Sequence, residues 1–188
     1  MAKVYKDLRE FLATLEEEGQ LVRVKEEIMP EPDIGAAGRA AANLENSPAI
    51  LFEKVNGYKY SVVTNVHGSW RNHALMMGMS KDTPVKEQFF ELDRRWDKFP
   101  VPPKVLAREE ALCKENVITE NINLFDILPL YRINEQDGGF FLSKASVVTG
   151  DPEFPDDFNK LNVGIYRMQV KDVDKLAIQP LPMHDIAI

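Results

Sequence analysis

The stretch Asn162-Val-Gly-Ile-Tyr-Arg-Met-Gln-Val170 decides the fold of the C-terminal part of the chain. It is rich in β-branched and aromatic residues, and similar runs lie on either side of it, at 140–148 and 176–182. Turn-forming residues at 151–152 and 172–174 separate the three runs. Short β-rich runs between turns are typical of consecutive strands. The sequence therefore predicts the opening strands of a mainly antiparallel sheet or barrel.

The part before residue 104 mixes helical and strand periodicity. Apolar residues at helical spacing predict helices near 8–15, 34–44, 70–79 and 85–96. Gly19 follows the first helix as a stop signal, and Thr83 precedes the last one as an N-cap. The apolar stripe of the last helix consists of Val85, Phe89, Leu92 and Trp96.

Strand signals and a proline cluster complete the domain prediction. A short strand is expected at 21–24, and a hairpin at 49–52 and 60–63 with a type I′ turn at Asn56-Gly57. The cluster Phe99-Pro-Val-Pro-Pro103 cannot continue a helix and marks a domain boundary. We expect an α+β protein, with a small N-terminal α/β domain over 1–104 and a second, incomplete domain over 105–188.

Composition limits the class of protein. The chain has 188 residues, 44% of them hydrophobic, and a net charge of −7. It lacks the basic cluster of a general nucleic-acid binder. No apolar run approaches the roughly 18 to 20 residues of a membrane span. The single cysteine, Cys113, excludes an internal disulfide. We therefore expect a cytoplasmic protein.

Three polar side chains near the C-terminus suit an anionic cofactor and a metal: the amide of Asn162, the guanidinium of Arg167 and the imidazole of His184. Asn162 and Arg167 are five residues apart, so on a flat strand they face opposite ways, and the strand must bend or bulge for both to reach one pocket. His67 and His73 lie six residues apart in sequence and do not have the spacing of a helical metal pair.

The whole chain resembles the UbiD-like decarboxylases, in particular the large subunit of bacterial non-oxidative hydroxyarylic acid decarboxylases. The resemblance is carried by 7–12, 30–33, 82–90, 123–130 and 162–170. It implies a split β-barrel flavin-binding domain over 105–188. It also implies prenylated FMN supplied by a partner flavin prenyltransferase, a divalent metal (usually manganese) with potassium in some members, and removal of a carboxylate from aromatic or α,β-unsaturated acids. We further expect a homo-oligomer.

The resemblance assigns roles to individual residues. It implies that Asn162 and His184 bind the metal and that Arg167, the candidate catalytic residue, contacts the cofactor and the substrate carboxylate. The cofactor-binding set that it implies is Asn162, Gly164, Ile165, Tyr166, Arg167, Met183 and His184.

Other residues that the family needs, including the acid/base glutamate and the third metal ligand, lie downstream of the matched segment. Residues 185–188 also read as the first turn of a helix that the end of the chain cuts. We therefore expect this 188-residue piece alone to have little or no decarboxylase activity.

Two alternative functions remain open from the sequence. One is an FMN-binding split-barrel oxidoreductase, and the other is a non-catalytic scaffold or assembly fragment. Under the decarboxylase hypothesis, the sequence does not indicate whether the substrate is 4-hydroxybenzoate, vanillate or protocatechuate.

Overall fold

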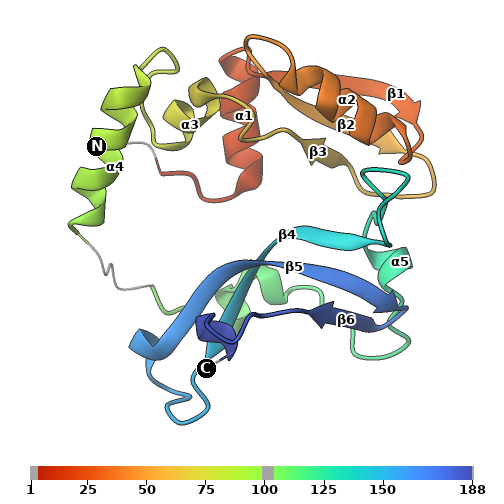
Figure 1. Cartoon of the computed structure of the whole chain (residues 1–188), viewed down its shortest axis with the longest axis vertical. Coiled ribbons are helices and arrows are strands. Elements are labelled where there is room, and N and C mark those ends of the chain that lie inside the picture. Colours follow the sequence, from red (N-terminus) through yellow and green to blue (C-terminus); the bar gives the residue numbers. More distant parts are fainter. Residues whose placement is uncertain (1–3, 99–103, 188) are drawn as a thin grey trace. The chain divides into compact units, whose positions relative to one another are not determined.

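The computed structural model describes residues 4–98 and 104–187. The chain divides into two compact units, Met1–Thr119 and Glu120–Ile188, each with its own sheet (Figure 1). Helices and strands occur in both, which confirms the α+β class. The proline cluster at 99–103 lies outside the described residues, and the domain boundary after residue 104 stays a prediction.

The first unit has a mixed three-stranded sheet of order β1-β2-β3, in which β1 and β2 are parallel and β2 and β3 antiparallel. Its elements are α1 (Leu8–Glu17), β1 (Leu21–Ile28), α2 (Asp33–Ala42), β2 (Ala49–Val55), β3 (Val62–Thr64), α3 (Trp70–Met76) and α4 (Val85–Trp96). Two short 3-10 helices, Arg108–Glu110 and Leu112–Lys114, follow α4.

Helix α1 forms where the apolar spacing from Leu8 to Leu15 predicts it, and its buried face builds the core. The Asp7 side chain accepts a hydrogen bond from the Glu10 backbone N–H at 2.9 Å, which satisfies a free amide of the first turn. Gly19 has φ +70° just after the helix, a conformation that favours glycine. Phe11 and Leu15 are buried against Ala49 of β2 and Leu75 of α3.

Two local predictions in this unit are wrong. Gly57 has φ +81°, but Asn56 does not have positive φ, so the β2–β3 turn is not type I′. The Asn56 side chain instead donates to Glu27 Oε1 at 3.2 Å. Thr83 does not cap α4, because Pro84 occupies the N-cap position and no side chain caps the helix; the Thr83 hydroxyl donates to the Ser80 carbonyl at 2.7 Å.

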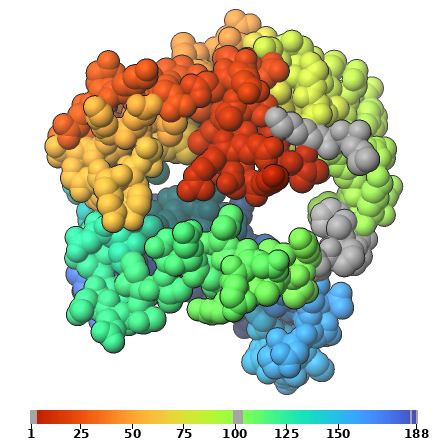
Figure 2. All heavy atoms as spheres, turned by 180° about the vertical axis from the view of Figure 1, so that it is seen from behind, coloured from red at the N-terminus to blue at the C-terminus, as the bar shows by residue number. Residues whose placement is uncertain are grey.

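The predicted apolar stripe of α4 exists but is exposed. Phe89 is 57% exposed and Trp96 69%. The helix contacts α3 through neighbouring side chains: Arg95 donates to the Met77 carbonyl at 2.6 Å, and the Phe89 ring lies 5.9 Å from that of Trp70. Figure 2 shows α4, in yellow-green, at the edge of the first unit.

The second unit contains the predicted antiparallel strands, in the order β4-β5-β6. Its elements are α5 (Leu124–Ile127), β4 (Phe141–Gly150), β5 (Leu161–Asp172) and β6 (Lys175–Ile178), with short 3-10 helices at Phe158–Lys160 and Asp185–Ala187. The strands form a meander, and its closure into a split barrel stays a prediction. None of the described helices is long and apolar enough to cross a membrane.

One face of this sheet carries exposed apolar side chains. Val148 on β4 pairs with Val163 on β5, and they are 59% and 68% exposed. The next apolar residue on that face, Ile165, is 66% exposed. The buried part of the unit lies elsewhere, around Leu130 and Val170. The sheet is therefore buried near Val170, whereas the face that bears Val163 and Ile165 is exposed.

Candidate functional site

Strand β5 sorts the candidate residues onto two faces. Successive side chains of a strand point to opposite sides, so Asn162, Gly164 and Tyr166 share one face, and Ile165 and Arg167 share the other. Asn162 and Arg167 therefore lie on opposite faces of β5, as expected for side chains five residues apart on a strand. Each of them contacts different neighbours for this reason.

The Asn162 amide is held by two hydroxyl groups. Its Nδ2 donates to Thr149 Oγ1, directly across on β4, at 3.4 Å, and to the Tyr166 hydroxyl at 3.3 Å. An amide nitrogen has two hydrogens, so both contacts can form at once. The amide oxygen is thereby turned away from both hydroxyls.

His184 reaches the same neighbourhood from the segment after β6. A tight turn holds it: its backbone N–H donates to the Leu181 carbonyl at 2.9 Å, and the Leu181 N–H donates to its Nδ1 at 3.3 Å. Its ring lies 6.2 Å from the ring of Tyr166, tilted by 58°. Tyr166 thus contacts Asn162 at its hydroxyl and His184 at its ring, although 18 or more residues separate His184 from both.

Arg167 rests on an aromatic ring. Its guanidinium carbon lies 3.7 Å from the centre of the Phe141 ring, a cation–π contact. Opposite Arg167, two residues of β4, Ser143 and Lys144, face one residue of β5, because Leu142 pairs with Met168 and Ala145 with Tyr166. The bulge opposite Arg167 therefore lies in β4, and it leaves Asn162 and Arg167 on opposite faces of β5 instead of bringing both to one pocket.

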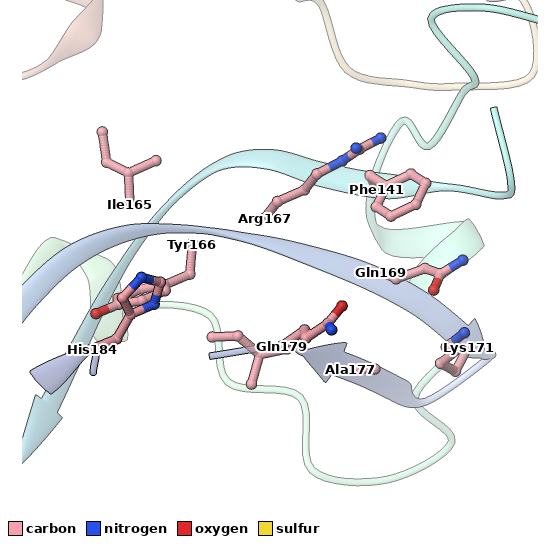
Figure 3. A pocket seen from close by; sticks show the side chains of 10 residues that line it. Phe141, Ile165, Tyr166, Arg167, Gln169, Lys171, Ala177, Gln179 and His184 are labelled. Carbon is pink, nitrogen blue, oxygen red and sulfur yellow. The ribbon is translucent and has the colours of Figure 1, made fainter. Parts of the chain in front are cut away.

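Five of the seven candidate residues line two hollows of the second unit, and Gly164 and Met183 line neither. The first, of about 500 Å³, is lined by Arg167, Phe141, Ile165, Tyr166, Lys171 and His184, among others (Figure 3). The second, of about 590 Å³, is lined by Asn162, Gly150, Lys160 and Thr149, among others. Arg167 and His184 thus share a hollow, and Asn162 lines another.

Figure 3 shows Arg167 extending toward Phe141, whereas Tyr166 and His184 lie together elsewhere along β5. Met183 is 77% exposed and lines neither hollow. Phe141 and Thr149 were not predicted as neighbours of the site. Both lie on β4, and only the register of the strand pair, bulge included, brings them to Arg167 and Asn162.

The donor set suits a hard divalent metal in part. An amide oxygen and an imidazole nitrogen are ligands of manganese or magnesium, and the orientation of Asn162 leaves its oxygen available. His184 must first release the Leu181 N–H, because with Nδ1 as acceptor a neutral ring carries its proton on Nε2. Within 4–98 and 104–187 no group of three or more His, Cys, Asp or Glu side chains could hold a metal ion.

Two family models match the chain. The model described as the 3-octaprenyl-4-hydroxybenzoate carboxy-lyase N-terminal domain matches residues 12–92. The one described as the Rift-related domain of the same carboxy-lyase matches residues 104–188. Both are UbiD models, and their order in the chain is N-terminal domain first.

Curated relatives match over almost the whole chain. The chain is 76% identical to a phenolic acid decarboxylase of Sedimentibacter hydroxybenzoicus over 100% of its length, and 62% identical to one of Bacillus subtilis over 98%. It spans 39% of the length of each of these relatives.

Solved structures share the fold. The closed form of the Sedimentibacter hydroxybenzoicus vanillic acid decarboxylase has a TM-score of 0.96 and 76% identity, over 99% of this chain and 39% of that one. An evolved dimeric form of the UbiD-class enzyme HmfF from Pelotomaculum thermopropionicum, in complex with prFMN, has a TM-score of 0.82 and 33% identity. That match covers 97% of this chain and 40% of the other.

Proposed function

This chain belongs to the UbiD family of carboxy-lyases, and from that premise we propose that it forms part of a prenylated-FMN-dependent, non-oxidative decarboxylase of hydroxybenzoic acids. The observation that carries the proposal is the 76% identity to a phenolic acid decarboxylase over the whole chain. The hollow shared by Arg167 and His184 supports it, because it offers cationic and imidazole groups in a space of about 500 Å³.

Arg167 is the proposed catalytic residue. Its guanidinium is permanently charged and presents donors in a fork that matches a carboxylate. Phe141 restricts this side chain to one side of the hollow. A guanidinium held in place binds the substrate carboxylate with less loss of side-chain entropy, and it aligns the bond to be broken.

Prenylated FMN, when bound, would supply an electrophilic carbon for covalent catalysis of the decarboxylation. The residues of β5 would hold this cofactor. We assign Gly164, Ile165 and Tyr166 to backbone contacts along the flavin. Met183 belongs to the same proposed set as a neighbour in the segment before His184.

Asn162 and His184 are the proposed metal ligands within this chain, through the amide oxygen and an imidazole nitrogen. Manganese would suit this donor set, and potassium is the proposed second ion. Tyr166 contacts both side chains, which supports their joint role. The structures of HmfF, a UbiD-class enzyme of 33% identity, include one in complex with prFMN.

Residues outside these 188 would complete the site in this proposal. The chain spans 39% of the length of the phenolic acid decarboxylases that it matches, and the acid/base group is not among the residues assigned here. The 188-residue piece alone is therefore expected to be inactive. Release of carbon dioxide by this piece, loaded with prenylated FMN and manganese, would contradict that expectation.

The proposal is tested with the full-length gene product, co-expressed with a flavin prenyltransferase. Carbon dioxide release is measured with 4-hydroxybenzoate, vanillate and protocatechuate. The expected result is turnover of at least one of them without added nicotinamide. Oxidation of a nicotinamide donor with no decarboxylation would favour a flavin oxidoreductase, and failure to retain any flavin would favour a non-catalytic scaffold. A homo-oligomer is also expected, and light scattering on the same preparation measures it.

A further inference from the structure

We propose that Tyr166 is a positioning residue for Asn162: its hydroxyl, together with that of Thr149, fixes the amide so that the oxygen faces the metal. This inference rests on the proposed function, because it takes Asn162 as a metal ligand. It goes further because it gives the Tyr166 side chain a role, whereas the family resemblance implies only that the backbone of Tyr166 contacts the flavin.

The side-chain amide of Asn162 lies between the hydroxyl groups of Tyr166 and Thr149. Nδ2 donates to Tyr166 Oη at 3.3 Å and to Thr149 Oγ1 at 3.4 Å. A metal requires the amide oxygen. In that orientation the two hydroxyls still accept both hydrogens of the amide nitrogen, so they stabilise the orientation that a metal needs.

Gly164 leaves the space through which the Tyr166 side chain reaches Asn162. The two residues lie four apart on the same face of β5, with Gly164 between them. The Tyr166 ring occupies the place of the missing side chain: a Cβ at Gly164 would lie 2.4 Å from Cε2, 2.9 Å from Cζ and 3.0 Å from Oη of that ring. The absent side chain lets the ring lie along the strand toward Asn162.

The two variants that follow from this geometry are Tyr166→Phe and Gly164→Ala. The first removes only the hydroxyl and keeps the ring against Gly164 and His184. The second places a methyl group where the ring lies, so the ring must move away and take the hydroxyl with it. Gly164 has no positive φ, so alanine suits the backbone there.

The experiment measures Mn²⁺ binding to the full-length gene product in the presence of saturating FMN, from the EPR signal of the free ion. Outer partners of metal ligands affect affinity by about 10- to 100-fold when they are removed. Because the contact is long, we expect Tyr166→Phe to weaken Mn²⁺ binding by about 10-fold, at the low end of that range. Gly164→Ala should lose a similar factor. In the double variant the losses should not add, because both act through one hydroxyl.

The matched control is Tyr60→Phe, which removes a tyrosine hydroxyl from an exposed residue of the first unit and should leave Mn²⁺ binding unchanged. The Asn162→Ala variant distinguishes a failure of the positioning role of Tyr166 from a failure of the proposed metal site. If Asn162→Ala weakens Mn²⁺ binding and Tyr166→Phe does not, the positioning role is wrong while the proposed metal site stands. If Asn162→Ala itself changes nothing, the metal site fails, and this inference fails with it.

Discussion

Replacing Phe141 with leucine removes the aromatic face on which Arg167 rests and keeps an apolar side chain of similar size. The contact is close, because the guanidinium carbon lies 3.7 Å from the ring centre. Arg167 is exposed in this structure, and cation–π contacts at exposed sites contribute about 0.5 to 1 kcal/mol. At 1.4 kcal/mol per factor of ten, this is a change of about 2- to 5-fold in an equilibrium constant.

The direction follows from preorganisation. Without the ring, the Arg167 side chain regains rotamer freedom that carboxylate binding must then remove. We expect the Phe141→Leu variant of the full-length gene product, loaded with prenylated FMN, to lose about 2- to 5-fold in affinity for a non-reacting benzoate, and a similar factor in kcat/KM with its best hydroxybenzoate.

The matched control is Phe90→Leu, which removes the contact between Lys86 and the Phe90 ring on α4 of the first unit. It should leave both measurements unchanged. Equal or tighter benzoate binding in Phe141→Leu would refute the reasoning, since the ring would then not be holding the guanidinium in its binding position.

Three further predictions concern stability. Leu15 is fully buried in the first core, so Leu15→Ala should lower the free energy of unfolding in urea by about 2 to 5 kcal/mol, whereas Leu8→Ala, at a 52% exposed site, should change it far less. Hydrogen bonds from Arg94, and to a smaller extent from Arg95, hold the pKa of Glu91 at about 2 instead of the ordinary 4.5. The contribution of the ionised Glu91 to folding stability is therefore present above pH 4.5 and is lost as the pH falls toward 2. The melting temperatures of the protein and its Glu91→Gln variant should converge over that range. Burial raises the pKa of Tyr131 above its ordinary 10.0, so stability should fall as the pH rises past 10, and Tyr131→Phe should lack this decline.

Local patterns predicted the elements whose own residues determine them. The spacing of Leu8 to Leu15 predicted α1, because one face of a helix must be buried whatever its partner is. The β-rich run at 162–170 predicted β5 in the same way. Two other local predictions were wrong: Pro84 and not Thr83 occupies the N-cap position of α4, and Asn56 contacts Glu27 without taking positive φ.

The candidate site residues could be chosen from the sequence, but their contacts could not. The sequence indicated Asn162, Arg167 and His184 and predicted a bend that brings the first two to one pocket, but they stay on opposite faces of β5 and line different hollows. It could not reveal that Phe141 lies under Arg167, because that contact depends on a bulge in β4. Nor could it show that Tyr166 joins Asn162 to His184, since the turn that brings His184 back is a matter of tertiary structure.

The central claim is tested most directly by the cofactor that the full-length gene product carries. The flavin released after co-expression with a prenyltransferase is identified by its mass, and manganese is quantified per flavin, in the natural protein and in His184→Ala. The account predicts prenylated FMN with bound manganese in the natural protein and loss of the metal in the variant. FMN of unmodified mass, or manganese content that the variant leaves unchanged, would contradict it.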